Sequence, residues 1–206
     1  MVGRSPTPTY LRLFLDITQG MGLAGAAGVR PFLPALLSGA LGRADLGLDF
    51  EHTRYAFLES NWFLIAVVVL LIVTVVIERR SPGAAESGTF GAALGGVAVG
   101  IGTLLFAGSL ADHGETSWAW LAPGIACALV GQAAARSLFG RVARRLDPEA
   151  RAALPLYADG GSLATAALAI LIPPISILIL GFFGWLWVGG RKRAGEKYAG
   201  LRTLTK

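Results

Sequence analysis

The amino-acid sequence predicts an all-α integral membrane protein. Of its 206 residues, 54% are hydrophobic and 15% are charged, whereas soluble domains carry about 25% charged residues. The charges are clustered, and this leaves four uncharged runs, at residues 62–77, 87–111, 116–135 and 160–190. About 20 helical residues cross a ~30 Å hydrocarbon core. Several such runs in one short chain favour a single transmembrane domain over residues 1–206.

Five hydrophobic blocks organise this domain. They cover about residues 10–41, 55–77, 88–111, 117–135 and 162–188. The middle three blocks have ordinary lengths for single spans. The first and last are longer and are interrupted by prolines, which remove helical donors and clash with the preceding turn. We therefore expect half-helices or a re-entrant hairpin in these two blocks.

The first block contains a permanent cation, Arg30, followed by Pro31 and Pro34. Proline suits the first turn of a helix, so we expect a break after Val29 and a half-helix that starts at Pro31. A charge inside a bilayer costs about 2.5–3.5 kcal/mol and is usually turned inward and paired. Arg30 could therefore bind carbonyls freed at the break or an acid such as Asp16 or Asp159.

The second interpretation of Arg30 is an anion or lipid-headgroup site beside a helix N-terminus. Broken apolar segments near both ends of a chain are typical of transporter sites near the bilayer midplane. Asp159 and Ser162 open the last block, as helix caps or as ligand contacts. The candidate substrate-binding residues are Arg30, Pro31, Asp16, Gln19, Asp159, Ser162, Pro173 and Pro174.

The third block is rich in glycine. Gly91 and Gly95, and likewise Gly96 and Gly100, are four residues apart, a spacing that lets helix backbones approach closely in lipid. The pattern indicates tight packing inside one chain or a homodimer contact through the glycine faces.

The segment 136–155 is basic. Its apolar residues recur at helical spacing between Arg141, Arg144 and Arg145. We expect either an interfacial helix that binds anionic lipid headgroups on the cytoplasmic face, or ordinary positive-inside residues.

The loop charges predict the topology. The loops after the second and fourth blocks hold arginines, and the loop at residues 112–117 holds no Lys or Arg, so the first two should be cytoplasmic. The first block then enters from the cytoplasm and crosses. The last block would place the basic tail, residues 191–206, outside unless Pro173-Pro174 forms a hairpin. The hairpin places both termini in the cytoplasm; the alternative is one kinked span with an external tail.

Catalytic patterns are absent from the sequence. The two histidines, His52 and His113, have no partners at metal-ligand spacing, and no phosphate- or dinucleotide-binding motif occurs. We expect no enzyme, no cofactor and no metal. The net charge of +5 flanks apolar runs, so it indicates membrane topology and anionic lipid instead of nucleic acid.

Two features resemble a family of small bacterial membrane proteins known only as a domain of unknown function. They are the run into Gly28-Val29-Arg30-Pro31-Phe32 and the acid Glu78, which ends the next span shortly before Pro82. The chain departs from that family at Arg79-Arg80, where an acid and a lysine are common. The resemblance implies a polytopic α-helical protein of the bacterial inner membrane with no settled activity.

Three function hypotheses follow. The first is a small transporter or channel with a midplane, anion-attracting site at Arg30. The second is a non-transporting protein that binds lipid or assembles membrane complexes. The third, a membrane-embedded enzyme, lacks converging catalytic groups and ranks last.

Overall fold

The computed structural model describes residues 9–48, 50–51, 53–81, 84, 88–111 and 118–199, without the side chains of residues 148 and 191–199. These residues form an all-α bundle with no strand among them. The helices are α1 (Thr9–Val29), α2 (Phe32–Gly42), α3 (Asn61–Arg80), α4 (Gly88–Ala111), α5 (Leu121–Ala143), α6 (Pro148–Arg151), α7 (Leu154–Leu171) and α8 (Ile175–Ala199). Short 3-10 helices cover Ala56–Glu59 and Trp118–Trp120.

Four helical segments are long and apolar enough to cross a membrane, so the chain is a multi-pass membrane protein. They are Asn61–Arg80, Gly88–Ala111, Trp118–Ala143 and Glu149–Leu171. Two shorter apolar helices, Phe32–Gly42 and Ile175–Gly190, accompany them.

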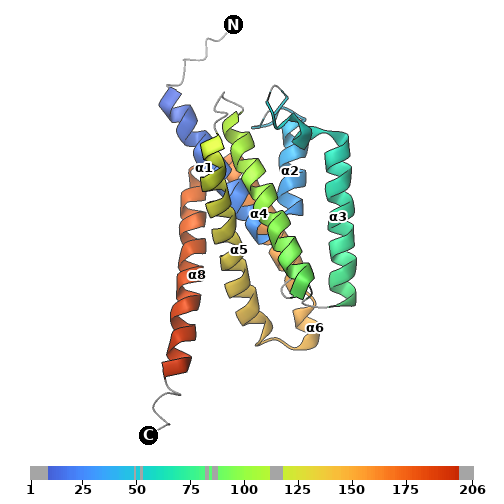
Figure 1. Cartoon of the computed structure of the whole chain (residues 1–206), viewed down its shortest axis with the longest axis vertical. Coiled ribbons are helices and arrows are strands. Elements are labelled where there is room, and N and C mark those ends of the chain that lie inside the picture. Colours follow the sequence, from blue (N-terminus) through green and yellow to red (C-terminus); the bar gives the residue numbers. More distant parts are fainter. Residues whose placement is uncertain are drawn as a thin grey trace.

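Helix α1 forms the centre of the bundle and packs against α4, α5, α7 and α8 (Figure 1). The contacts with α5 are made by backbone. A Cβ on Gly131 would collide with the Gly25 carbonyl, and a Cβ on Gly28 would collide with the Ala128 carbonyl. Small residues at these crossings let the helix axes approach closely, because no side chain stands between them.

The first block is a helical hairpin. The last helical bond of α1 runs from the Arg30 amide to the Ala26 carbonyl at 3.1 Å, and Pro31, which lacks an N–H, precedes α2. Gln19 Nε2 donates to the Gly47 carbonyl at 2.9 Å, so the chain after α2 has returned to the middle of α1. The predicted break at Arg30-Pro31 is therefore present, and it reverses the chain.

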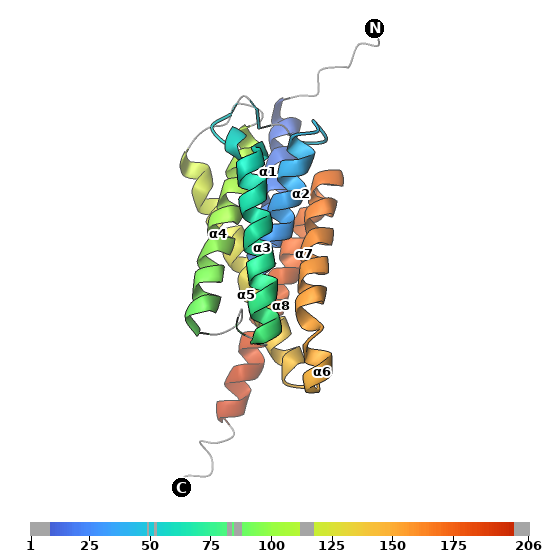
Figure 2. The same ribbon diagram turned by 90° about the vertical axis from the view of Figure 1, so that its right-hand side faces the viewer.

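The chain reverses again at Pro173-Pro174. Helix α7 ends where the Ile172 amide bonds to the Leu168 carbonyl at 2.8 Å, and the two following prolines offer no donors. At the other end of α8, the Leu186 carbonyl accepts from Ser137 Oγ of α5 at 3.2 Å. Helix α8 thus returns toward the end of the bundle where α7 begins (Figure 2).

One end of the bundle collects arginines. Helices α3 and α5 end there and α4 and α7 begin there (Figure 1), so Arg79, Arg80, Arg144 and Arg145 lie at this end, called here the basic end. Helix α8 also runs to the basic end, whereas α1 begins at the opposite end. The expectation that both termini lie on one side does not agree with this arrangement, because the first block returns instead of crossing.

Two element boundaries also differ from the expectation. Residues 136–143 belong to α5, so the basic segment 136–155 is not a separate surface helix, although the short α6 lies within it. Helix α7 begins at Leu154 instead of Ser162. Pro155 fits its first turn, and the charge of Asp159 in its second turn has a partner in Arg30.

Helix α3 lies at the edge of the bundle. Its contacts with other helices are with α2 and the short helix Ala56–Glu59, and many of its apolar side chains are exposed. Exposed valine and isoleucine on a spanning helix suit a lipid-facing position. Glu78, two residues before the end of α3, is buried.

Candidate functional site

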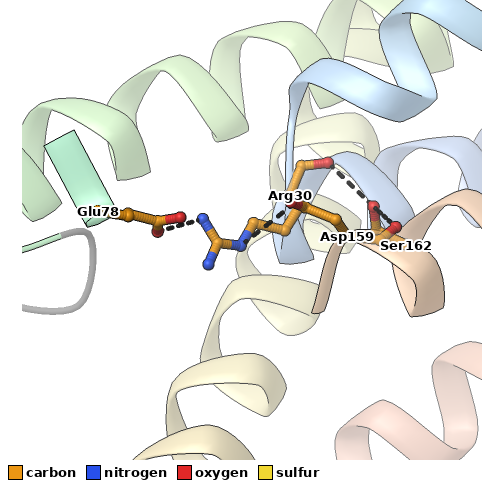
Figure 3. Close-up of polar contacts among 4 residues, drawn as sticks. All are labelled: Arg30, Glu78, Asp159 and Ser162. Carbon is orange, nitrogen blue, oxygen red and sulfur yellow. Dashed lines mark hydrogen bonds and ion pairs between the residues drawn. The ribbon is translucent and has the colours of Figure 1, made fainter. Parts of the chain in front are cut away.

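The tip of the α1–α2 hairpin presents Arg30 to two acids. Arg30 Nη1 lies 2.6 Å from Glu78 Oε1 of α3, and Arg30 Nε lies 3.6 Å from Asp159 Oδ1 of α7 (Figure 3). The three side chains are 13%, 8% and 19% exposed, respectively. Charges this deeply buried require partners, because desolvation of an unpaired ion costs several kcal/mol.

Ser162 joins the hairpin tip to α7 by a second route. Its Oγ lies 3.2 Å from the Asp159 carbonyl and 3.5 Å from the Arg30 carbonyl (Figure 3). The Arg30 carbonyl lies at the break and is one of the backbone acceptors left at the C-terminal end of α1. Asp159 and Ser162 lie inside α7 and do not cap it, because the helix begins earlier.

A cavity adjoins the hairpin tip. It has about 70 Å³ of space open to water-sized molecules, enough for several waters. Its polar wall groups come from Arg30, Gln132 and Arg136, and no described residue of its wall is acidic. The remaining wall is mainly small or apolar and comes from Gly28, Val29, Pro31, Gly91, Leu94, Gly95, Ala98, Ala135, Phe139, Leu154 and Ala158.

Two arginines line this cavity, and one of them, Arg30, is paired with Glu78 and Asp159. Arg30 uses Nη1 and Nε for the acids, and Nη2 makes no hydrogen bond to any described residue (Figure 3). Arg136 is exposed and forms no ion pair with the part of the chain that the structure describes. Guanidinium donors without protein partners are suited to carboxylate or phosphate oxygens.

The cavity lies nearer to the basic end than to the middle of the bundle. Glu78 is close to the end of α3, Gly91 is close to the start of α4, and Ala158 is close to the start of α7. This position differs from the expected midplane site, because the hairpin reaches past the middle before it turns.

A family model described as Domain of unknown function (DUF4126) matches residues 17–192. The chain belongs to the DUF4126 family. No curated protein and no solved structure matches it. The matched range of this DUF4126 protein contains Arg30, Glu78, Arg136 and Asp159.

Two of the predicted site residues in this DUF4126 protein lie far from Arg30. The Asp16 carbonyl accepts from Ser109 Oγ at 3.3 Å, near the end of α4, and Gln19 bonds to Gly47. Eleven helical residues separate Gln19 from Arg30, about 16 Å at 1.5 Å per residue. Asp16 is therefore not the acid that pairs with Arg30, and neither residue lines the cavity.

Pro173 and Pro174 also lie outside the cavity wall. They follow the end of α7, whereas Asp159 lies near its start, about 20 Å away along the helix. Ser176, which follows these prolines, packs against α1, where a Cβ on Gly22 would collide with it. The two interrupted blocks thus meet along α1, but their breaks do not form one site, because the two hairpins turn at different levels.

Sequence reasoning missed three residues of the site: Glu78, Gln132 and Arg136. Glu78 was recognised as a mark of the family resemblance, but the following Arg79-Arg80 weakened its assignment to any role. Gln132 and Arg136 are four residues apart and therefore share one face of α5. A Cβ on Gly95 would lie 2.6 Å from Gln132 Nε2 and 2.8 Å from Arg136 Nη2, so Gly95 makes room for both.

The glycines of α4 have two environments. Gly91 and Gly95 face the cavity, whereas a Cβ on Gly96 or Gly100 would meet no atom within 4 Å. The first pair therefore contributes to packing within the chain, and the second pair lies on the outer surface.

The three predicted lipid-binding arginines also have different environments. Arg141 and Arg145 line a groove between α5 and α8, and Arg144 does not. Arg145 lies beyond the end of α5, in a turn where its amide bonds to the Val142 carbonyl at 2.9 Å. His52 and His113 lie outside the described residues, and no group of three metal-ligating side chains occurs within the described part.

Proposed function

We propose that this DUF4126 protein is a small membrane transporter or channel that holds a solute with an anionic group at the tip of the α1–α2 hairpin. One observation supports this most: the wall of the cavity beside the hairpin tip contains two arginines and no described acid. An arginine in a membrane segment is costly and is usually functional.

Glu78 and Asp159 position Arg30 for this role. Each carboxylate takes one nitrogen of the guanidinium, which fixes its plane between α3 and α7. An incoming carboxylate or phosphate would accept from Arg30 Nη2 and from Arg136, and Gln132 Nε2 would supply a neutral donor.

The α1–α2 hairpin holds Arg30 in position beside the cavity. Helix α1 starts at the end of the bundle opposite the basic end, and α2 runs back toward that same end. Packing and the ion pairs of Arg30 hold the tip between them in place. Irregular backbone at such depth is tolerated where protein covers it or a cavity lies beside it. We place the basic end in the cytoplasm of a bacterial inner membrane, which puts the beginning of α1 outside.

Osmotic swelling of proteoliposomes tests the proposal. Vesicles are mixed with chloride, phosphate or lactate salts, and light scattering reports which anions enter. We expect at least one anion to enter faster than through protein-free vesicles. Arg136→Gln should slow that entry about tenfold, the size expected from a lost charge-assisted hydrogen bond.

Arg80→Gln is the matched control. Arg80 is an exposed arginine at the same end of the bundle and lies outside the cavity wall, so its substitution should leave anion entry unchanged. Equal entry with and without protein, or equal effects of the two substitutions, would rule the proposal out.

The alternative function is a non-transporting protein that binds lipid or assembles membrane complexes. The groove beside Arg141 and Arg145 favours its lipid-binding form. In that case Arg136→Gln would have no effect on any flux, whereas substitutions in the groove would change lipid binding.

A further inference from the structure

A groove runs between α5 and α8 at the basic end, separate from the Arg30 cavity. Its volume is about 270 Å³. Helix α5 contributes Arg141, the turn after it contributes Arg145, and α8 contributes Trp185, Leu186 and Gly189. Beside the groove, Ser137 Oγ of α5 donates to the Leu186 carbonyl of α8.

The groove has a charged part and an apolar part. Arg141 and Arg145 form no ion pair with any residue that the structure describes. Leu138, Val142 and Leu186 form the apolar wall beside them. Arg141 lies two residues before the end of α5, which is the depth at which a spanning helix reaches the lipid headgroups.

Trp185 marks the same depth. Its side chain is 66% exposed although it lines the groove, and its ring stacks on Phe182 with centroids 6.0 Å apart. Tryptophan concentrates at the membrane–water interface, where one part of the ring is apolar and its N–H is wet.

We propose that this groove binds one anionic phospholipid. Its phosphodiester would lie between the guanidinium groups of Arg141 and Arg145, and an acyl chain would lie along Leu138 and Leu186. Basic pockets between spanning helices on the cytoplasmic side bind anionic headgroups in this manner. The apolar wall favours a lipid over free phosphate, because inorganic phosphate has no apolar part to contact it. The proposal does not depend on the function of the Arg30 cavity.

Quenching of tryptophan fluorescence by brominated lipid tests the proposal. The full chain is reconstituted in phosphatidylcholine vesicles that contain an equal fraction of either brominated phosphatidylglycerol or brominated phosphatidylcholine. The Trp185→Phe variant, measured in parallel, isolates the Trp185 signal from the other four tryptophans. We expect the quenching of Trp185 to show a preference of the groove for brominated phosphatidylglycerol over brominated phosphatidylcholine of about fivefold or more. This is the preference expected from one arginine.

Arg144→Gln is the matched control for Arg141→Gln/Arg145→Gln. It removes an arginine from the same stretch of α5 and its C-cap but outside the groove. The double variant should abolish the preference for phosphatidylglycerol, and the control should retain it. Equal quenching by the two lipids in the native chain would overturn the proposal, whatever the folding of the variants.

Two other results would also overturn it. If Arg144→Gln removes the preference, the attraction belongs to the whole basic surface. If inorganic phosphate at millimolar concentration reverses the quenching, the groove recognises phosphate without the acyl chain.

Discussion

Arg30 Nη1 and Glu78 Oε1 lie 2.6 Å apart although 48 residues separate them in the sequence. This ion pair connects the tip of a buried hairpin to α3, a helix at the edge of the bundle. It therefore combines two roles: it compensates a buried cation and it attaches the lower part of an edge helix.

The first prediction concerns this pair. Glu78→Gln or Arg30→Gln should each lower the free energy of unfolding by about 3–5 kcal/mol, because each removes one member of a buried ion pair. The double variant should lose less than the sum of the single losses. Unfolding in mixed detergent, followed by circular dichroism, measures all four members of the cycle. Arg79 is exposed, so Arg79→Gln should change the free energy of unfolding little. Additive losses in the Arg30–Glu78 cycle would contradict the pairing.

The second prediction concerns the crossing of α1 and α5. Gly131→Ala should destabilise the protein by about 1–3 kcal/mol, because the new methyl group collides with the Gly25 carbonyl and the two helices must separate. Gly140→Ala, at a helical glycine of α5 with open space around it, should be neutral or stabilising. Thermal melting in detergent compares the two variants, and equal melting temperatures would show that the helices do not cross as closely as described.

The third prediction concerns topology. In a chain with Cys127→Ala, single cysteines at Leu46, Ile172 and Glu149 should label from two sides. Positions 46 and 172 should react from one side, because Gly47 contacts Ile170, and position 149 should react from the other. All three residues are exposed. A membrane-impermeant maleimide on intact cells measures this, and labelling of 46 and 149 from the same side would contradict the three crossings by α3, α4 and α5 that separate them.

The fourth prediction concerns the mouth of the first hairpin. Gln19→Leu should cost about 1 kcal/mol, the usual contribution of one hydrogen bond, because Gln19 Nε2 donates to the Gly47 carbonyl. Its effect should be smaller than that of Arg30→Gln, since no charge is left unpaired. Chemical denaturation compares the two, and a larger loss for Gln19→Leu would show that the hairpin is held mainly at its mouth.

Local signals were sufficient for the helices but not for their arrangement. Uncharged runs and prolines predicted the three middle spans and the breaks at Arg30-Pro31 and Pro173-Pro174. Whether a broken block crosses or returns depends on what packs around it. For the first block that is α4, α5, α7 and α8, which come later in the chain.

The site was only partly predictable for the same reason. Arg30 stood out because a cation in an apolar run needs a partner, and Asp159 was among the acids considered. Glu78 could not be chosen over Asp16 from spacing, since the choice depends on which way the hairpin faces. In the sequence, Arg136 does not differ from other positive residues at a membrane surface. Its place beside the cavity depends on Gly95 of α4, which has no side chain to exclude it.

The central position of α1 has a consequence for synthesis. The ribosome makes this helix before α4, α5, α7 and α8, which enclose it. Arg30 is synthesised before either of its acids, and Asp159 follows 129 residues later. The first hairpin must therefore wait at the membrane surface or beside the insertion machinery until the helices that enclose it have been made.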